Sequence, residues 1–221
     1  MDEKVWNAVD KYTCERLGPA DAALDFALQN SRRAELPATS VAPNQGKLLN
    51  LLARSIQAQR ILEIGTLGGY STIWLARALP KEGRLVTLEL DSKHAEVARE
   101  NIVKANLQDR VEIRVGPALE TLPQLEQENA APFCLTFIDA DKFNIPRYFE
   151  WAIKLSRPGS MIIVDNVVRN GALIDEHSTD PNVIGVRRLH DLIAQEPRVS
   201  ATTLQTVGAK GYDGLTFALV E

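Results

Sequence analysis

Oxygen-bearing side chains follow two apolar segments of the sequence, at the point where each segment ends. One segment is followed by Asp139, Asp141 and Lys142, and the other by Asp165 and Asn166. Apolar runs of this length predict buried strands, and the side chains just beyond such strands lie at the mouth of a sheet. We expect Asp139, Asp165 and Asn166 to form a divalent-metal site there, because Mg²⁺ prefers carboxylate and amide oxygens. Lys142 would then be close enough to act on a molecule held by the metal.

A glycine-rich turn between a predicted strand and a predicted helix indicates a second binding site. The turn runs from Gly65 to Gly69, and Ser71 follows at the start of the helix. Glycines allow the backbone to pass close under a ligand, and the helix N-terminus presents free N–H groups. Glu89 ends the next strand, at roughly the 20-residue distance where an acidic side chain commonly binds ribose hydroxyls. Glu63, two residues before the first glycine, could face a cationic or amino-bearing ligand.

Two other functions compete with that of a metal-dependent enzyme. A nicotinamide-dependent oxidoreductase would use a related sheet, but its fingerprint is G-x-G-x-x-G, and this turn does not match that spacing. The second alternative is a non-catalytic module that binds a cofactor or forms a dimer. Such a module would have no need for the complete set of Asp139, Lys142, Asp165 and Asn166. Single residues also have simpler explanations. Asp141 could form a local ion pair, Lys142 could be a solvated lysine, and we expect His94 to be inert on a charged helix face.

Strands and helices alternate from about residue 60 onward, which predicts an α/β fold. This order implies a mainly parallel sheet with helices on both faces. Residues 208–214 join the last two strands and leave no room for a helix, so these strands should pair antiparallel. The predicted strands are 60–64, 84–90, 111–115, 133–138, 160–164, 199–207 and 215–220, and a clear helix is predicted over 92–105.

Helices are also predicted before the first strand. One should turn Leu48, Leu52 and Ile56 to a single apolar face, and another should do the same with Val5, Val9 and Tyr12. We expect one domain over residues 1–221, with 1–40 as a helical cap or dimer arm and 41–221 as the catalytic core.

Composition narrows the class of protein. Hydrophobic residues make up 45% of the 221 residues and the formal net charge is −4, so a large core is expected and a nucleic-acid surface is not. No stretch approaches the roughly 20 apolar residues of a membrane span. The two cysteines, Cys14 and Cys134, do not form a disulfide framework. We therefore expect a cytoplasmic protein that binds neither nucleic acid nor a membrane.

Five motifs of the chain together resemble those of one known family. They are Glu63-Ile-Gly65-Thr-x-x-Gly69-Tyr70-Ser71, Glu89, Gly116-Pro117-Ala118, Asp139-Ala-Asp141-Lys142 and Asp165-Asn166. The family is that of the cation-dependent O-methyltransferases, which includes caffeoyl-CoA and catechol O-methyltransferases and their small bacterial relatives. The resemblance extends from about Thr39 to the C-terminus. It implies a Rossmann-like class I methyltransferase fold, with a seven-stranded, mostly parallel sheet whose last strand is antiparallel.

The resemblance also implies an activity and roles for single residues. The expected reaction is transfer of a methyl group from S-adenosylmethionine (SAM) to a vicinal dihydroxy aromatic, such as a catechol or a hydroxycinnamate-type phenol. The expected metal is Mg²⁺, Mn²⁺ or Ca²⁺, held by Asp139, Asp165 and Asn166. Residues implied to bind SAM are Val41, Glu63, Gly65, Thr66, Gly69, Ser71, Glu89, Ala118, Asp139 and Asp141.

Lys142 and Asp139 are the implied catalytic residues, and Lys142 would take or stabilise the hydroxyl proton. Asn170 matches a family position near the substrate, and a homodimer is expected. The chain departs from better-known members at Leu67, at the loop 43–47, which lacks an acidic residue, and at the long cationic turn 208–214. These differences concern the choice of methyl acceptor more than the cofactor or the metal.

Overall fold

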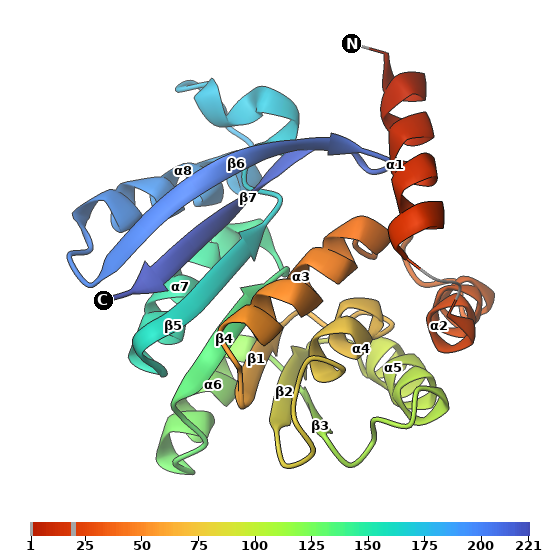
Figure 1. Cartoon of the computed structure of the whole chain (residues 1–221). Helices are drawn as coiled ribbons and strands as arrows, with labels where there is room; N and C mark the ends of the chain where they lie inside the picture. Colours follow the sequence, from red (N-terminus) through yellow and green to blue (C-terminus); the bar gives the residue numbers. More distant parts are fainter. Residues whose placement is uncertain (1, 19–20) are drawn as a thin grey trace.

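Seven strands form one sheet in the order β3-β2-β1-β4-β5-β7-β6 (Figure 1). The computed structural model describes residues 2–18 and 21–221. The strands are β1 (Arg60–Ile64), β2 (Arg84–Glu89), β3 (Val111–Val115), β4 (Phe133–Ile138), β5 (Ser156–Asp165), β6 (Val199–Gly208) and β7 (Gly211–Val220). β7 pairs antiparallel with both β5 and β6, whereas the pairs among β1 to β5 are parallel. The predicted α/β fold, with its antiparallel last strand, is confirmed.

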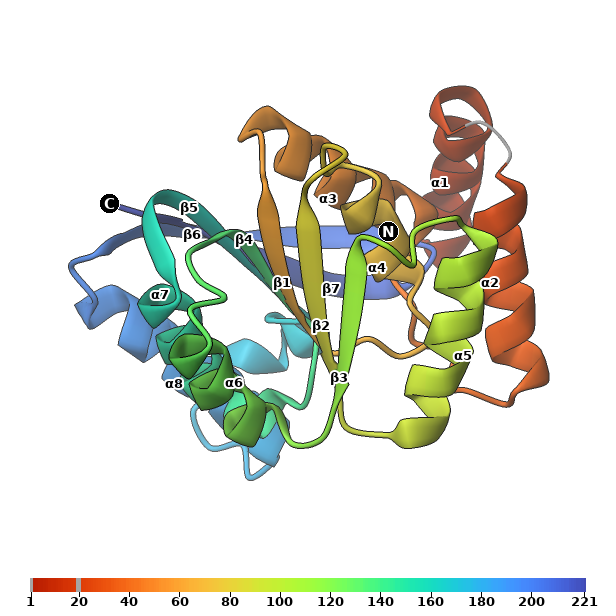
Figure 2. The ribbon, with the colours of Figure 1, turned by 90° about the horizontal axis from the view of Figure 1, so that it is seen from below.

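The helices cover both faces of this sheet (Figure 2). Their bounds are α1 (Glu3–Leu17), α2 (Ala22–Arg33), α3 (Pro43–Ser55), α4 (Tyr70–Ala76), α5 (Ser92–Lys104), α6 (Ala118–Gln127), α7 (Ile145–Lys154) and α8 (Pro181–Gln195), with short 3-10 helices η1 (Lys142–Asn144) and η2 (Arg169–Ile174). Successive side chains of a strand point to opposite faces. Accordingly, Leu62 of β1 packs in the cluster that includes α6, α7 and α8, and Ile61 packs in the cluster that includes α2 to α5.

The strand register brings the predicted site residues to one edge of the sheet. Ile64 of β1 lies opposite Leu88 of β2 and Ile138 of β4, and Ile138 lies opposite Val164 of β5. The residues that follow these positions therefore meet at the carboxyl ends of four neighbouring strands. This edge is where open α/β sheets bind their ligands.

Two local predictions need correction. In α3, Leu52 and Ile56 pack against the core as predicted, but Leu48 is 37% exposed, and the buried positions include Gly46, Leu49 and Ala53. The small residues Gly46 and Ala53 let α3 pack closely against its neighbours. The spacing of the leucines and isoleucine in the sequence did not reveal this. The connection between β6 and β7 is a two-residue turn between Gly208 and Gly211 rather than a loop over 208–214, because both strands extend further than their apolar residues indicate.

The N-terminal helix α1 has no buried residue, and the apolar side chains Val5, Val9 and Tyr12 are all more than half exposed. Residues 1, 19 and 20 of the predicted cap lie outside the described residues. Throughout the described part of the chain, no helix combines the length and the apolar character needed to cross a membrane.

Candidate active site

A cavity of about 480 Å³ opens at the carboxyl ends of β1, β2 and β4. This volume is typical of a small-molecule site. Nine residues predicted from the sequence line it: Val41, Gly65, Thr66, Ser71, Glu89, Ala118, Asp139, Asp141 and Asn166. Four others are not among its lining residues: Glu63, Gly69, Lys142 and Asp165. The cavity therefore brings together the glycine turn and the acidic strand ends, with a second layer of predicted residues behind its wall.

Gly65 is required where β1 turns into the floor of the cavity. Its φ is +100°, in the left-handed region, and a Cβ at this position would overlap the carbonyl oxygen of Asp139. Only glycine avoids both the strain and the overlap. Gly69 also has a positive φ and precedes the first residue of α4, so it shapes the turn without lining the cavity.

Glu89 ties the glycine turn to the end of β2. Its Oε2 accepts hydrogen bonds from the backbone N–H groups of Thr66 (3.1 Å) and Leu67 (2.7 Å), and its Oε1 accepts one from Asp91 (3.0 Å). The side chain is buried but lines the cavity. Glu89 therefore has a structural role that the sequence did not show, and its contact with ribose hydroxyls stays a prediction.

Glu63 lies behind the cavity wall, fully buried among three hydroxyl groups. Its carboxylate accepts hydrogen bonds from Ser71 (2.6 Å), Thr72 (2.5 Å) and Thr87 (2.7 Å). Burial raises the pKa of Glu63 to about 7, the hydrogen bonds oppose this rise, and the charge of Asp139 adds to it. Ser71 lines the cavity and donates to Glu63, so the hydroxyl of Ser71 lies between Glu63 and the cavity, and the role of Glu63 in ligand binding stays a prediction.

We predict that Glu63 makes folding stability depend on pH. Its folded-state pKa of about 7 lies above its ordinary value of 4.5, so the folded protein holds this proton more tightly than the unfolded chain does. Its contribution to the free energy of unfolding is therefore fully present below pH 4.5 and is lost as the pH rises through about 7. The slope is at most about 1.4 kcal/mol per pH unit. Urea unfolding at pH 5 and pH 7.5 should show a smaller loss of stability for Glu63→Gln than for the wild type. Equal losses would contradict the assignment.

The metal-site prediction rests on side chains at the ends of β4 and β5. Asp139 directly follows the pair Ile138–Val164, and Asp165 is the last residue of the neighbouring strand. Asn166 then has a φ of +57°, and asparagine is one of the few non-glycine residues that adopt this left-handed conformation readily. The chain therefore turns sharply after β5, and Asn166 lines the cavity together with Asp139.

The charges at this edge fit a cation. Burial and, after it, the nearby charge of Asp139 raise the pKa of Asp165 to about 7. Lys142 is the basic partner close by, with Nζ 3.1 Å from Oδ1 of Asp139. Among the residues described, no group of three or more His, Cys, Asp or Glu side chains is arranged to hold a metal. A divalent ion here would thus use two carboxylates, the Asn166 amide, and oxygens from water or substrate, which is a donor set that suits Mg²⁺.

Lys142 is held against the site by the elements around it. It begins η1, only 7% of its surface is exposed, and it donates to Asp139. Gly185 of α8 lies directly over its backbone, because a Cβ at Gly185 would overlap the Lys142 carbonyl oxygen. This burial contradicts the simpler explanation that Lys142 is a solvated surface lysine.

Asp141 is exposed at the cavity edge and is held by hydrogen bonds rather than by an ion pair. It accepts hydrogen bonds from the hydroxyl of Tyr148 (2.6 Å) and from the side-chain amide of Asn144 (2.7 Å). Burial, followed by the hydrogen bond to Asp141, raises the pKa of Tyr148 well above its usual range. Tyr148 and Asn144 both line the cavity and were missed, since neither is part of a motif.

His94 was expected to be inert on a charged helix face. The structure places it in the cavity wall, and its expected inertness stays a prediction. Nδ1 of His94 lies 3.5 Å from Oε1 of Glu89. The charged residues around His94 in the sequence lie on the outer face of α5. His94 itself lies in the first turn of this helix, beside the end of β2. In the sequence, only the spacing of five residues between Glu89 and His94 indicated that His94 could lie near the end of β2.

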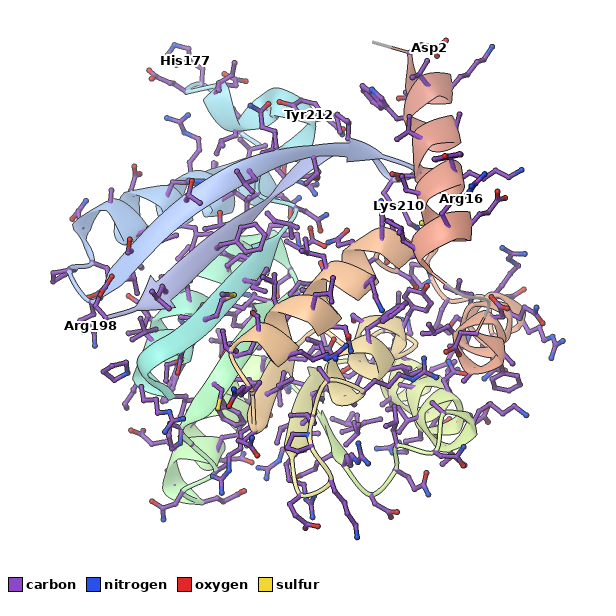
Figure 3. The ribbon with its side chains drawn as sticks, viewed as in Figure 1. Asp2, Arg16, His177, Arg198, Lys210 and Tyr212 are labelled. Carbon is purple, nitrogen blue, oxygen red and sulfur yellow. The ribbon has the colours of Figure 1, made fainter. Side chains whose placement is uncertain are left out.

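The segment after β5 is joined to the β6–β7 hairpin. Oδ1 of Asp213 accepts hydrogen bonds from the backbone N–H groups of Val168 and Arg169, each at 2.9 Å. The ring of Tyr212 lies 3.5 Å from the position of a Cβ at Gly171, and Figure 3 shows Tyr212 beside η2. Asn170 is exposed within η2, outside the residues that line the main cavity, so its proximity to a substrate stays a prediction.

Comparison with known families gives one match over most of the chain. The model of a family described as O-methyltransferase matches residues 21–219. This range contains every site residue discussed above and excludes the whole of α1.

Individual relatives agree with this match. A catechol O-methyltransferase of Niastella koreensis is 52% identical over 221 residues, which is 100% of both chains. A solved O-methyltransferase of Bacillus cereus in complex with SAH has a TM-score of 0.98 at 59% identity and 100% coverage of both chains. The O-methyltransferase TomG of Streptomyces achromogenes, solved with SAM, has a TM-score of 0.97 at 53% identity and covers 100% of this chain and 99% of its own.

Proposed function

Because the chain belongs to the O-methyltransferase family, we propose that it transfers a methyl group from SAM to a hydroxyl of a vicinal dihydroxy aromatic, with the help of a divalent cation. The observation that carries the proposal is the placement of Asp139 and Asp165 at neighbouring strand ends, beside the cavity and next to buried Lys142. The 52% identical relative, named as a catechol O-methyltransferase, supports this class of acceptor.

SAM would occupy the 480 Å³ cavity. Two solved relatives hold SAH or SAM, and their folds superimpose on this chain with TM-scores of 0.98 and 0.97. The backbone of Gly65 would lie beneath the ligand, Glu89 would bind the ribose, and Ala118 would lie at the adenine. Val41, Ser71 and Asp141 would surround the methionine end. The nicotinamide alternative lacks support, since the matched family is that of O-methyltransferases.

A divalent cation would be held by Asp139, Asp165 and Asn166. When bound, such a cation favours the ionised form of a chelated hydroxyl and fixes its orientation. With both carboxylates ionised, Asp139 and Asp165 carry two negative charges against the one positive charge of Lys142, and burial together with this repulsion raises the pKa of Asp165. The side chains alone therefore leave an excess negative charge that a cation would offset.

Lys142 would handle the proton of the acceptor. As the methyl group moves from the sulfonium sulfur to the acceptor oxygen, the C–S bond breaks with its electron pair left on sulfur, and the hydroxyl proton must leave. Asp139 holds Nζ of Lys142 at 3.1 Å, which places it beside the metal ligands. As a neutral amine Lys142 would take this proton, and as an ammonium it would stabilise the oxyanion that the proton leaves. A general base at such a position contributes about 10²- to 10⁴-fold to the rate.

Methyl transfer from labelled SAM to a small panel of catechols, with Mg²⁺ and then with EDTA, tests the proposal. We expect methylated product with Mg²⁺ and none with EDTA. If product still forms in EDTA, the metal requirement is refuted, but the proposed methyl transfer stands. SAM binding without product on any vicinal diol would favour a different acceptor, or the non-catalytic alternative.

A homodimer formed through α1 is part of the proposal. Val5, Val9 and Tyr12 lie one turn apart and are 55%, 54% and 58% exposed, and α1 stands at the edge of the molecule in Figure 1. We predict that Val9→Glu shifts the protein to a monomer in size-exclusion chromatography with light scattering, because a charge cannot be buried unpaired. Lys11→Glu, which changes another face of α1, should leave the dimer intact. A wild-type monomer would refute the dimer.

We also propose a cytoplasmic location. It is supported by the thiols of Cys14 and Cys134, neither of which forms a disulfide.

A further inference from the structure

A hydrogen bond from α3 reaches one of the proposed metal ligands. Nε2 of Gln45 donates to Oδ2 of Asp165 at 2.7 Å, and the backbone N–H of Asn166 donates to Oδ1 of the same carboxylate at 2.7 Å. An ionised carboxylate only accepts hydrogen bonds, so the atom of Gln45 that faces it is the amide nitrogen. Each oxygen of Asp165 thus has one donor, and the two donors together fix the plane of the carboxylate.

Gln45 extends from a helix terminus that is itself held in place. Oδ1 of Asn44 accepts the backbone N–H of Gln45 at 2.9 Å, and Nδ2 of Asn44 donates to Asp10 of α1 at 2.8 Å. The other oxygen of Asp10 accepts the backbone N–H of Ala209 in the β6–β7 turn at 2.8 Å. The start of α3 is therefore joined to α1 and to the hairpin.

A close helix contact restricts Gln45 from the other side. A Cβ at Gly46, the next residue, would overlap the indole of Trp74 in α4. The first turn of α3 therefore has little freedom to move toward or away from the sheet. The backbone that carries Gln45 is therefore held in place, and its side-chain amide donates to Asp165, which is 120 positions away in the sequence.

We propose that Gln45 is a positioning residue that holds the Asp165 carboxylate in the orientation needed to bind the divalent cation; this inference rests on the metal dependence in the proposed function. Asp165 is only 6% exposed, so water cannot easily replace a lost donor. A glutamine donates without adding positive charge, whereas a lysine or arginine here would compete with the cation. Removing such a partner of a metal ligand typically weakens metal binding by about 10- to 100-fold.

Calorimetric titration of Mg²⁺ into the full-length protein tests this role. Gln45→Met keeps the length of the side chain and removes the donor, and Gln45→Ala serves as a second variant if the first does not fold. The matched control is Gln59→Met, which changes an exposed glutamine at the opposite end of β1. We expect Mg²⁺ binding about 10- to 100-fold weaker for the Gln45 variants, with wild-type Mg²⁺ binding in the control.

Measuring SAM affinity distinguishes a role of Gln45 in positioning Asp165 from a general disturbance of the fold. Gln45 does not line the cavity proposed for SAM, so the Gln45 variants should bind SAM as the wild type does, and excess Mg²⁺ should restore most of their turnover. Unchanged Mg²⁺ binding in the Gln45 variants, with weakened binding in Asp165→Asn, would overturn the inference and leave the metal site standing. Equal loss of Mg²⁺ and SAM binding would also overturn it. A wild type that binds neither Mg²⁺ nor Mn²⁺ would refute the metal dependence itself.

Discussion

Replacing Asp139 with alanine is expected to lower the rate of methyl transfer by about three orders of magnitude, which corresponds to about 4 kcal/mol in the activation free energy. The variant removes a carboxylate at the end of β4 that is proposed to bind the metal and that also holds Lys142 at 3.1 Å. Loss of metal-assisted activation alone is worth several kcal/mol. The measurement is the single-turnover rate with labelled SAM and a catechol at saturating Mg²⁺.

Asp109→Ala is the matched control for this variant. Asp109 is an exposed aspartate in the turn before β3, outside the residues that line the cavity. Its replacement should leave the rate unchanged. An Asp139→Ala protein with wild-type rates would refute both the metal site and the role of Asp139 in holding Lys142.

Replacing Lys142 with methionine is expected to lower kcat by about 10²- to 10⁴-fold while SAM affinity stays close to that of the wild type. The expectation follows from its position, since Lys142 donates to Asp139 and does not line the cavity proposed for SAM. Methionine preserves most of the apolar volume of a side chain that is 7% exposed, so folding should survive. Turnover and SAM binding are measured on the same preparation.

Lys154→Met provides a matched comparison, because Lys154 is an exposed lysine of α7 that pairs with Glu126. It should have wild-type turnover. A Lys142→Met protein that is equally active would refute the proton-handling role. If it lost SAM binding as strongly as turnover, Lys142 would instead be a structural support of the cofactor site.

The sequence was sufficient to predict most of the sheet. Of the predicted strands, 60–64, 111–115 and 133–138 agree at both ends with β1, β3 and β4. β1 and β4 are almost entirely buried apolar runs, whereas β3 lies at an edge of the sheet and has no fully buried residue. The ends of β6 and β7 were less predictable from the sequence. β6 and β7 extend past their apolar residues to a short turn, since strand pairing there depends on backbone hydrogen bonds more than on burial.

Site residues at strand ends could likewise be predicted from the sequence. Parallel strands place their carboxyl ends at one edge, so Asp139 and Asp165 had to lie close together once their strands were neighbours. Asp139 and Gly65 of the glycine turn line the same cavity. The sequence did not show that Glu63 would be fully buried behind Ser71, because burial depends on the helices that cover the strand.

The sequence by itself determined the order of the elements, the residue types at the strand ends and the resemblance to a methyltransferase family, because these depend on local periodicity and on residues close together in the chain. Only the tertiary structure decided which distant side chains support that chemistry. Gln45 reaches Asp165 across 120 positions, and His94 approaches Glu89 from the adjoining helix α5. Such contacts depend on how closely the helices pack against one another and against the connecting segments, and small residues such as Gly46, against Trp74, and Gly185, over Lys142, allow that closeness.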